Sequence, residues 1–211
     1  MTQPWLLLMM TGAGMYLLRL WFEDRKVNRG KSPSPRALPG ATEAPHGASI
    51  IALGGMLVLL TAETLWERKL GLTSRQSQIT WLFGLYSVVA APVIEEIIFR
   101  GYLTIGLPAT ADRPSRPGAI AWMGAIGASI GFAALHPFLW RWDEAGFALT
   151  LDAKGWFSSA AAFATSLWLY AVRFGPWNPR RSLLPCFVGH GGKNLGVLVI
   201  KHAQGFVTGW F

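Results

Sequence analysis

The sequence is poor in charged residues and in cysteine. Only 14% of its 211 residues are charged, whereas soluble domains carry about 25%, and 52% are hydrophobic. Together with a mean hydropathy of +0.34, this deficit indicates a membrane protein. The single cysteine, Cys186, excludes an internal disulfide and any metal site built from several cysteines.

The His-Glu-x-x-His motif, which is the common signature of zinc proteases, is also missing. The net charge of +8 could suit a nucleic-acid-binding protein. However, the basic residues cluster between hydrophobic segments, where they set membrane topology and meet anionic lipid. We therefore expect the lipid bilayer to be the charged partner and expect no nucleic acid.

Six stretches have the length and composition of membrane-spanning helices, which need about 20 mostly apolar residues. They run from Pro4 to Phe22, Ala48 to Trp66, Ile79 to about Leu103, about Gly118 to Trp140, about Trp156 to Phe174, and about Leu183 to His202. The sequence thus predicts an all-α fold, a polytopic transmembrane helix bundle with about six spans. In the fourth span, Gly127-x-x-x-Gly131 predicts close helix packing.

The chain divides into residues 1–47, an N-terminal transmembrane helix with a polar linker, and residues 48–211, a transmembrane helical domain. We interpret the first helix as retained, because it lacks the basic start of a signal peptide. The polar segment, Glu23 to Gly47, contains the run Lys31 to Arg36, which is predicted to be a flexible linker. Ten Lys and Arg residues follow the odd-numbered spans and five follow the others, which places both termini outside the cytoplasm.

Polar side chains interrupt the third span, although a charge in hydrocarbon costs roughly 2.5 to 3.5 kcal/mol. Glu96 and Arg100 are four residues apart, so they share a helical face and can neutralise each other. Glu95 lies about 100° further round the helix and lacks that partner. An unpaired carboxylate suits a general base, whereas an ion network would serve stability alone. Pro92 is expected to kink the helix and to make room for water.

Two further helices carry polar pairs at helical spacing. His136 follows Phe132 by four residues, and Asn194 follows His190 by four. His136 alone could be either a structural hydrogen-bonding group or a functional one. A carboxylate, two imidazoles and an amide on three helices favour proton transfer and oxyanion binding over a purely structural network.

Two neighbouring charges are harder to place from the sequence. Lys193 lies between His190 and Asn194 and points elsewhere, so it could balance either Glu63 or Glu96. Glu63, near the end of the second span, is interpreted as an interfacial residue.

Three short motifs together resemble the CPBP family, which includes the type II CAAX prenyl endopeptidases and the bacteriocin-processing and immunity proteins. They stand as Glu95-Glu96-x-x-x-Arg100, Phe132-x-x-x-His136 and His190-x-x-x-Asn194. The resemblance covers about residues 79–202. It implies a glutamate-dependent intramembrane endopeptidase with its active site in the bundle core.

The resemblance also implies roles for individual residues. Glu95 would be the general base and His136 would help to activate water, while His190 and Asn194 would polarise the scissile carbonyl and hold its oxyanion. Supporting roles would fall to Glu96, Arg100 and Phe132. No cofactor is implied, but the Glu and His side chains could instead bind a divalent metal, and this stays open. The expected partner is a membrane-associated protein or peptide, and the expected location is a prokaryotic inner or plasma membrane.

Two alternatives and one difficulty accompany this hypothesis. A non-catalytic peptide-binding or immunity protein could share the fold, and a proton-coupled carrier could use the same side chains, although no internal repeat is evident. With straight helices, Glu95 lies near the cytoplasmic end of the third span and His136 near the outer end of the fourth. At 1.5 Å per residue their depths could differ by more than about 10 Å. The fourth helix must then begin late or protrude, or the third must extend to about Leu107.

Overall fold

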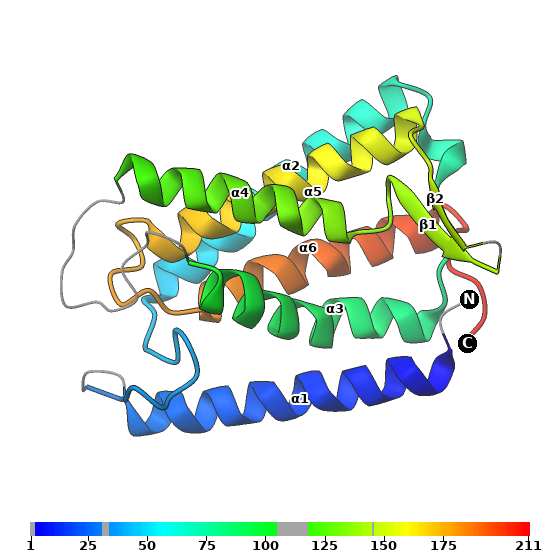
Figure 1. The fold of residues 1–211 in the computed structure, drawn as a ribbon. Coiled ribbons are helices and arrows are strands. Elements are labelled where there is room, and N and C mark those ends of the chain that lie inside the picture. Colours follow the sequence, from blue (N-terminus) through cyan, green and yellow to red (C-terminus); the bar gives the residue numbers. More distant parts are fainter. Residues whose placement is uncertain (1–2, 31–33, 105–117, 145) are drawn as a thin grey trace.

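The computed structural model describes residues 3–30, 34–104, 118–144 and 146–211, and within them the helices pack into one bundle (Figure 1). The long helices are α1 (Pro4–Val27), α2 (His46–Lys69), α3 (Trp81–Glu96), α4 (Ala119–Leu135), α5 (Ala153–Phe174) and α6 (Leu184–Ala203). A 3-10 turn, η1 (Thr73–Arg75), follows α2, and a π-helix, η2 (Ile97–Tyr102), continues α3. Two short strands, β1 (Trp140–Asp143) and β2 (Gly146–Leu149), join α4 to α5.

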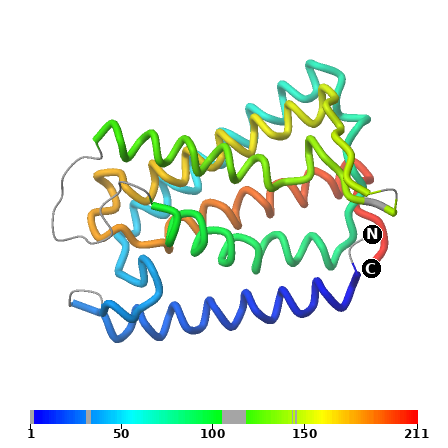
Figure 2. Tube along the Cα trace, viewed as in Figure 1, coloured from blue at the N-terminus to red at the C-terminus, as the bar shows by residue number. Residues whose placement is uncertain are grey.

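The helices are those of a membrane bundle, which confirms the all-α prediction. By length and composition, α1, α2 and the segment Trp81–Tyr102 could each cross a membrane, while α4 is apolar but shorter. The helices α5 and α6 are more polar, yet several of their polar side chains are buried in the bundle, among them Ser166, His190 and Lys193. The start of α1 and the C-terminal segment lie at the same end of the bundle (Figure 2).

The end of α4 corrects the predicted fourth span, which was drawn as far as Trp140. The helix stops at Leu135, and His136 has extended backbone angles (φ −76°, ψ 132°). The cause is Pro137, because the ring of a proline disfavours helical geometry in the preceding residue. The difficulty of depth is resolved by packing and not by the length of α4. The Phe132 ring, one turn before His136, has its centre 6.2 Å from that of His190, and His190 Nδ1 lies 2.8 Å from Glu96 Oε1.

The strands after α4 were not foreseen. They pair in antiparallel register, with Trp140 opposite Leu149 and Trp142 opposite Phe147. Gly146 begins β2 with a φ of +100°, a value that L side chains rarely adopt. The described residues between α4 and α5 therefore include a paired β-hairpin.

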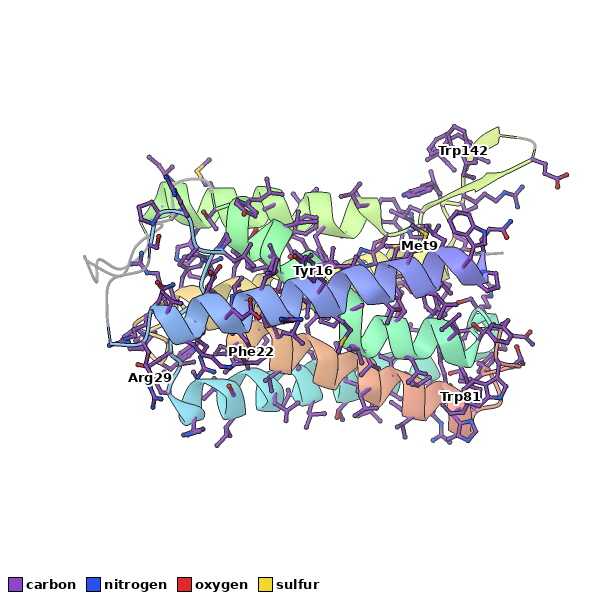
Figure 3. The ribbon with its side chains drawn as sticks, turned by 90° about the horizontal axis from the view of Figure 1, so that it is seen from below. Met9, Tyr16, Phe22, Arg29, Trp81 and Trp142 are labelled. Atoms are coloured by element: carbon purple, nitrogen blue, oxygen red, sulfur yellow. The ribbon has the colours of Figure 1, made fainter. Side chains whose placement is uncertain are left out.

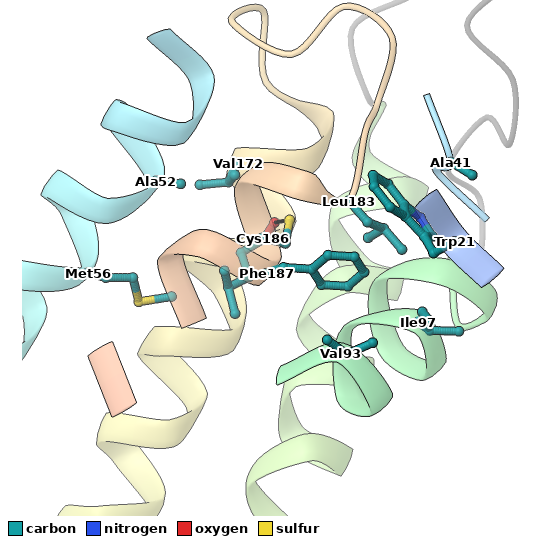
Figure 4. Packing of buried hydrophobic residues seen from close by; sticks show 11 residues of the cluster. Trp21, Ala41, Ala52, Met56, Val93, Ile97, Val172, Leu183, Cys186 and Phe187 are labelled. Atoms are coloured by element: carbon teal, nitrogen blue, oxygen red, sulfur yellow. Dashed lines mark hydrogen bonds between the residues drawn. The ribbon is translucent and has the colours of Figure 1, made fainter. Parts of the chain in front are cut away.

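One buried cluster, the principal core, joins α1, α2, α3, α5 and α6 through residues that include Trp21, Met56, Val93, Leu169 and Cys186 (Figure 4). Trp21 of α1 is fully buried against Phe187 of α6, with ring centroids 5.2 Å apart. Along α1, Gly14 permits close approach to α3, since a Cβ on Gly14 would lie 2.6 Å from that of Ala90. The first helix is therefore an integral wall of the bundle.

Much of the polar segment after the first span folds onto the bundle. The helix α1 continues to Val27, and residues 34–45 fold back onto the loop between α5 and α6. Leu183 N donates to Gly40 O, and Ser182 Oγ donates to Thr42 O at 2.8 Å. Ala41 is buried in the principal core. Part of the Lys31 to Arg36 run, residues 31–33, lies outside the described residues.

The predicted packing motif on α4 is also wrong. A Cβ added to Gly127 or to Gly131 would meet nothing within 4 Å. The side of α4 that meets α5 instead carries Ser129, which accepts a hydrogen bond from Ser166 Oγ at 2.9 Å. The spacing places both glycines on one face of α4, but the described residues do not pack against this face at either glycine.

Candidate active site

The end of α3 is shaped for a close encounter with α6. Pro92 is fully buried inside α3 and has no N–H, so Val88 O lacks its helical donor. Gly191 of α6 packs on that carbonyl, and a Cβ on Gly191 would lie 3.0 Å from it. This approach brings the preceding residue, His190, beside the two glutamates that end α3.

Directly after the glutamates the helix widens into η2. Leu103 N donates to Ile98 O, five residues back, which is the π pattern. Such π-segments cost hydrogen-bond geometry and occur often at functional sites. Here the segment carries Phe99 and Arg100, both buried, toward α4 and α5.

The two charges at the centre of the site are sealed from solvent. Glu96 and Arg100 are both 0% exposed, and Arg100 Nη1 lies 3.1 Å from Glu96 Oε1, as the four-residue spacing predicted. The Arg100 guanidinium lies 4.7 Å from the ring centre of Phe132 and 5.1 Å from that of Tyr170. Cation–π contact of this kind compensates a desolvated cation.

His190 connects the two glutamates. Its Nδ1 lies 2.8 Å from Glu96 Oε1, the same oxygen that Arg100 contacts, and its Nε2 lies 3.8 Å from Glu95 Oε2. The bond to Glu96 fixes the plane of the imidazole and leaves Nε2 facing Glu95. The ring donates from Nε2 at the same time as from Nδ1 only when it carries both protons.

Glu95 differs from Glu96 in its surroundings. Its side chain is 26% exposed, yet its Oε2 is buried and forms no hydrogen bond among the described residues. Of the two glutamates, Glu95 is therefore the one that a water molecule or a substrate can reach.

Aromatic packing joins α4 to this centre. The Phe132 ring is buried with its centre 5.0 Å from that of Phe99, 4.6 Å from that of His136 and 6.2 Å from that of His190. His136 Nδ1 lies 2.8 Å from Phe132 O, and its ring stacks on Phe138. His136 thus stands beside the ionic centre and contacts it through Phe132.

Asn194 lies one turn further along α6 and faces α3. Its Nδ2 donates to Ser87 O at 2.7 Å. An amide nitrogen carries two protons, so a second donor remains after this bond. The structure therefore gathers the residues of all three motifs around the contact of α3 and α6, with Asn194 held at its edge.

A second polar cluster lies on the other side of α6. Lys193 Nζ lies 2.8 Å from Glu63 Oε2 and donates to Thr165 Oγ1 at 2.7 Å. Lys193 thus balances Glu63 rather than Glu96, and Glu63 is held in an ion pair between α2 and α6. The cluster ties α6 to α2 and α5, so it fixes which face of α6 turns toward α3.

Removal of one member of this cluster should destabilise the bundle. We expect Lys193→Met to lower the free energy of unfolding by about 2 kcal/mol, because it leaves the Glu63 carboxylate without its partner. The value is less than for a sealed pair, because the Glu63 side chain is 23% exposed. Thermal unfolding in detergent measures the loss, and Glu63→Gln combined with Lys193→Met should recover most of it.

The exposed pair of Arg180 and Glu43 provides the control. Its side chains are 44% and 36% exposed, so Arg180→Met should shift stability by no more than about 1 kcal/mol. If the double variant at positions 63 and 193 were as unstable as Lys193→Met alone, the two charges would not be coupled.

One further pattern does not make a site. The stretch Gly127-Ala128-Ser129-Ile130-Gly131 fits Gly-x-Ser-x-Gly, which in α/β-hydrolases marks an exposed serine on a strand-to-helix turn. Here it lies within α4, and Ser129 is 0% exposed and bonded to Ser166. Such a nucleophile requires a strand followed by a turn, whereas Ser129 lies inside a helix. We therefore assign Ser129 to helix packing.

The donor set does not fit a metal. The described part of the chain contains no group of three or more His, Cys, Asp and Glu side chains placed to hold a metal ion. Glu96 Oε1 is shared by Arg100 and His190, and the close donors that remain are Glu95, the unbonded Glu96 Oε2 and one imidazole nitrogen. We therefore derive no step through a metal ion.

The comparison with protein families agrees with the three motifs. Residues 77–196 match the model of the type II CAAX prenyl endopeptidase Rce1-like family. The chain belongs to this family. The matched stretch contains every motif residue from Glu95 to Asn194, and it supports the resemblance to the CPBP proteins. None of the curated proteins and none of the solved structures matches the chain. The Rce1-like family is one of CAAX-type intramembrane proteases. Membership therefore supports protease chemistry at this site.

Proposed function

We propose that this protein is an intramembrane endopeptidase that hydrolyses a peptide bond of a membrane-associated protein or peptide, with Glu95 as general base. The observation that carries the proposal is the contrast between the two glutamates. Glu96 is sealed and shared by two cationic or hydrogen-bonding partners, whereas Glu95 is partly exposed with an unbonded buried oxygen 3.8 Å from His190. A base needs this combination of access and spare acceptor capacity.

The proposed reaction begins with a water molecule held between Glu95 and His136. Glu95 accepts one proton as the water oxygen attacks the scissile carbonyl carbon, and the carbonyl oxygen becomes an oxyanion. The C–N bond then breaks, and the proton on Glu95 passes to the departing amine. All atoms of water end in the two products, the carboxylic acid and the amine.

Two donors would stabilise the oxyanion. His190 Nε2 can donate when the imidazole carries both protons, and Glu96 faces its Nδ1 to stabilise that charge. The second proton of the Asn194 amide is the other donor. A single donor of this type is worth about 10²–10³ in rate. In this proposal Arg100 and Phe132 hold Glu96 and His190 in place and do not touch the substrate.

We propose that residues 48–211 form the catalytic unit and that residues 1–47 contribute α1 as a wall against α3. We also propose a prokaryotic inner or plasma membrane as the location. The substrate class is a membrane-associated chain, since the site lies within a bundle whose helices are apolar enough to span lipid.

Comparative proteomics of cells that carry either the wild-type protein or Glu95→Gln tests the proposal. We expect at least one membrane protein or peptide to accumulate uncut only in the variant. The purified wild-type protein in vesicles should cut that substrate at the same bond. If wild-type and variant cells had the same membrane peptides, and if Glu95→Ala kept the cellular function, a peptide-binding role would replace the protease.

A further inference from the structure

The hairpin between α4 and α5 exposes one continuous apolar face. Cross-strand pairing and the two-residue period of strands place Trp140, Trp142, Phe147 and Leu149 on the same side. Trp142 is 75% exposed, Phe147 58% and Leu149 63%. The Phe147 ring centre is 6.2 Å from that of Trp140 and 6.4 Å from that of Trp142. Such a face is costly in water and needs a covering partner.

The position of the hairpin along the bundle indicates that partner. At the same end stand the starts of α1 and α5, the end of α2 and the C-terminal segment (Figure 1). Each carries an exposed tryptophan, namely Trp5, Trp66, Trp156 and Trp210, with exposures between 54% and 65%. Trp81 and Trp142 also lie at this end (Figure 3). Tryptophan gathers where hydrocarbon meets water, so this end marks one membrane interface.

Apolar residues on both sides of the hairpin in the sequence are also exposed. Leu135, the last residue of α4, is 68% exposed, and Leu151, just after β2, is 59% exposed. Further along α4, Ile130 is 57% exposed. Since α4 lies in a membrane bundle, its outward side chains face lipid tails.

We propose that the hairpin lies on the lipid bilayer and inserts Trp142, Phe147 and Leu149 into the headgroup region, with its Arg141 and Ala148 face turned toward water. Amphipathic segments bind membranes in this way, through buried apolar area. The hairpin thereby anchors the connection between α4 and α5 at a fixed depth. Trp140 Nε1 donates to Ala134 O at 2.8 Å, which ties β1 to the last turn of α4, two residues before His136.

Depth-dependent quenching tests the proposal without any activity measurement. The full chain with Cys186→Ala would carry a single new cysteine, either Trp142→Cys or Leu149→Cys on the apolar face. The control is Ala148→Cys, which stands on the opposite face of the same strand. Each is labelled with an environment-sensitive fluorophore and reconstituted in vesicles of phosphatidylcholine and phosphatidylglycerol. Nitroxide on the lipid headgroup probes lipid contact, and iodide probes contact with water.

We expect labels at positions 142 and 149 to be quenched several-fold more by the lipid nitroxide than the label at 148, and less by iodide. Replacing Trp142 could itself weaken membrane binding. The Leu149→Cys variant keeps Trp142 and Phe147 and therefore controls for that effect. Equal lipid quenching on both faces would overturn the proposal. Protection of positions 142 and 149 from both quenchers would also overturn it, because a protein partner would then cover the face.

Discussion

Glu95→Gln is expected to lose peptide hydrolysis by about 10²–10⁴-fold, the range that a general base contributes. The change removes the proton acceptor and keeps the size of the side chain. It should leave the fold intact, because Glu95 Oε2 has no hydrogen bond to lose and the side chain is 26% exposed. The measurement is the turnover of a substrate peptide in vesicles, alongside thermal unfolding of the same preparation.

Glu144→Gln serves as the control for removal of a carboxylate. Glu144 is exposed in the turn of the hairpin, at the end of the bundle, and belongs to none of the three motifs. We expect the Glu144→Gln variant to turn over the substrate peptide at the wild-type rate. If Glu95→Gln retained wild-type turnover with a substrate that the wild-type protein cuts, Glu95 would not be the base and the proposed mechanism would be wrong.

The local part of the site could be predicted from the sequence. The Glu96–Arg100 contact follows from the pitch of a helix, as does the contact of Phe132 with His136. These pairs are four residues apart, so no tertiary information was needed. The family resemblance rests on the same spacings, and the family match to residues 77–196 supports it.

The contacts between helices could not be predicted in this way. The bond from His190 to Glu96 joins residues 94 positions apart, and the sequence left Lys193 with two possible partners. Which face of α6 meets α3 depends on packing, for example on the close approach of Gly191 to Val88 O. Such approaches are decided by the summed fit of many side chains, not by a local spacing.

One error could have been avoided. The fourth span was extended through Pro137 to Trp140 because the segment is uniformly apolar, although a proline disfavours helix in the residue before it. The alternation of Trp140, Arg141, Trp142 and Asp143 also has the period of a strand. An apolar run near an interface thus needs its proline and its period considered together.

The largest expected loss of stability follows Arg100→Met. Both Arg100 and Glu96 are 0% exposed, so the substitution would leave a buried carboxylate with only His190 to balance it. Removal of one partner from such a pair costs about 3–5 kcal/mol. We expect a correspondingly lower thermal midpoint in detergent and much less folded protein in the membrane.

Two companion variants separate charge from shape. Arg100→Lys keeps the positive charge but loses the flat guanidinium between Phe132 and Tyr170, so it should be intermediate in stability. Glu96→Gln combined with Arg100→Met removes both charges and should recover part of the loss, because no carboxylate is then left uncompensated. The double variant should nevertheless turn over slowly, since His190 would lose the carboxylate that orients it. A double variant that is as unstable as Arg100→Met would show that the guanidinium stabilises the bundle through its aromatic contacts instead of through Glu96.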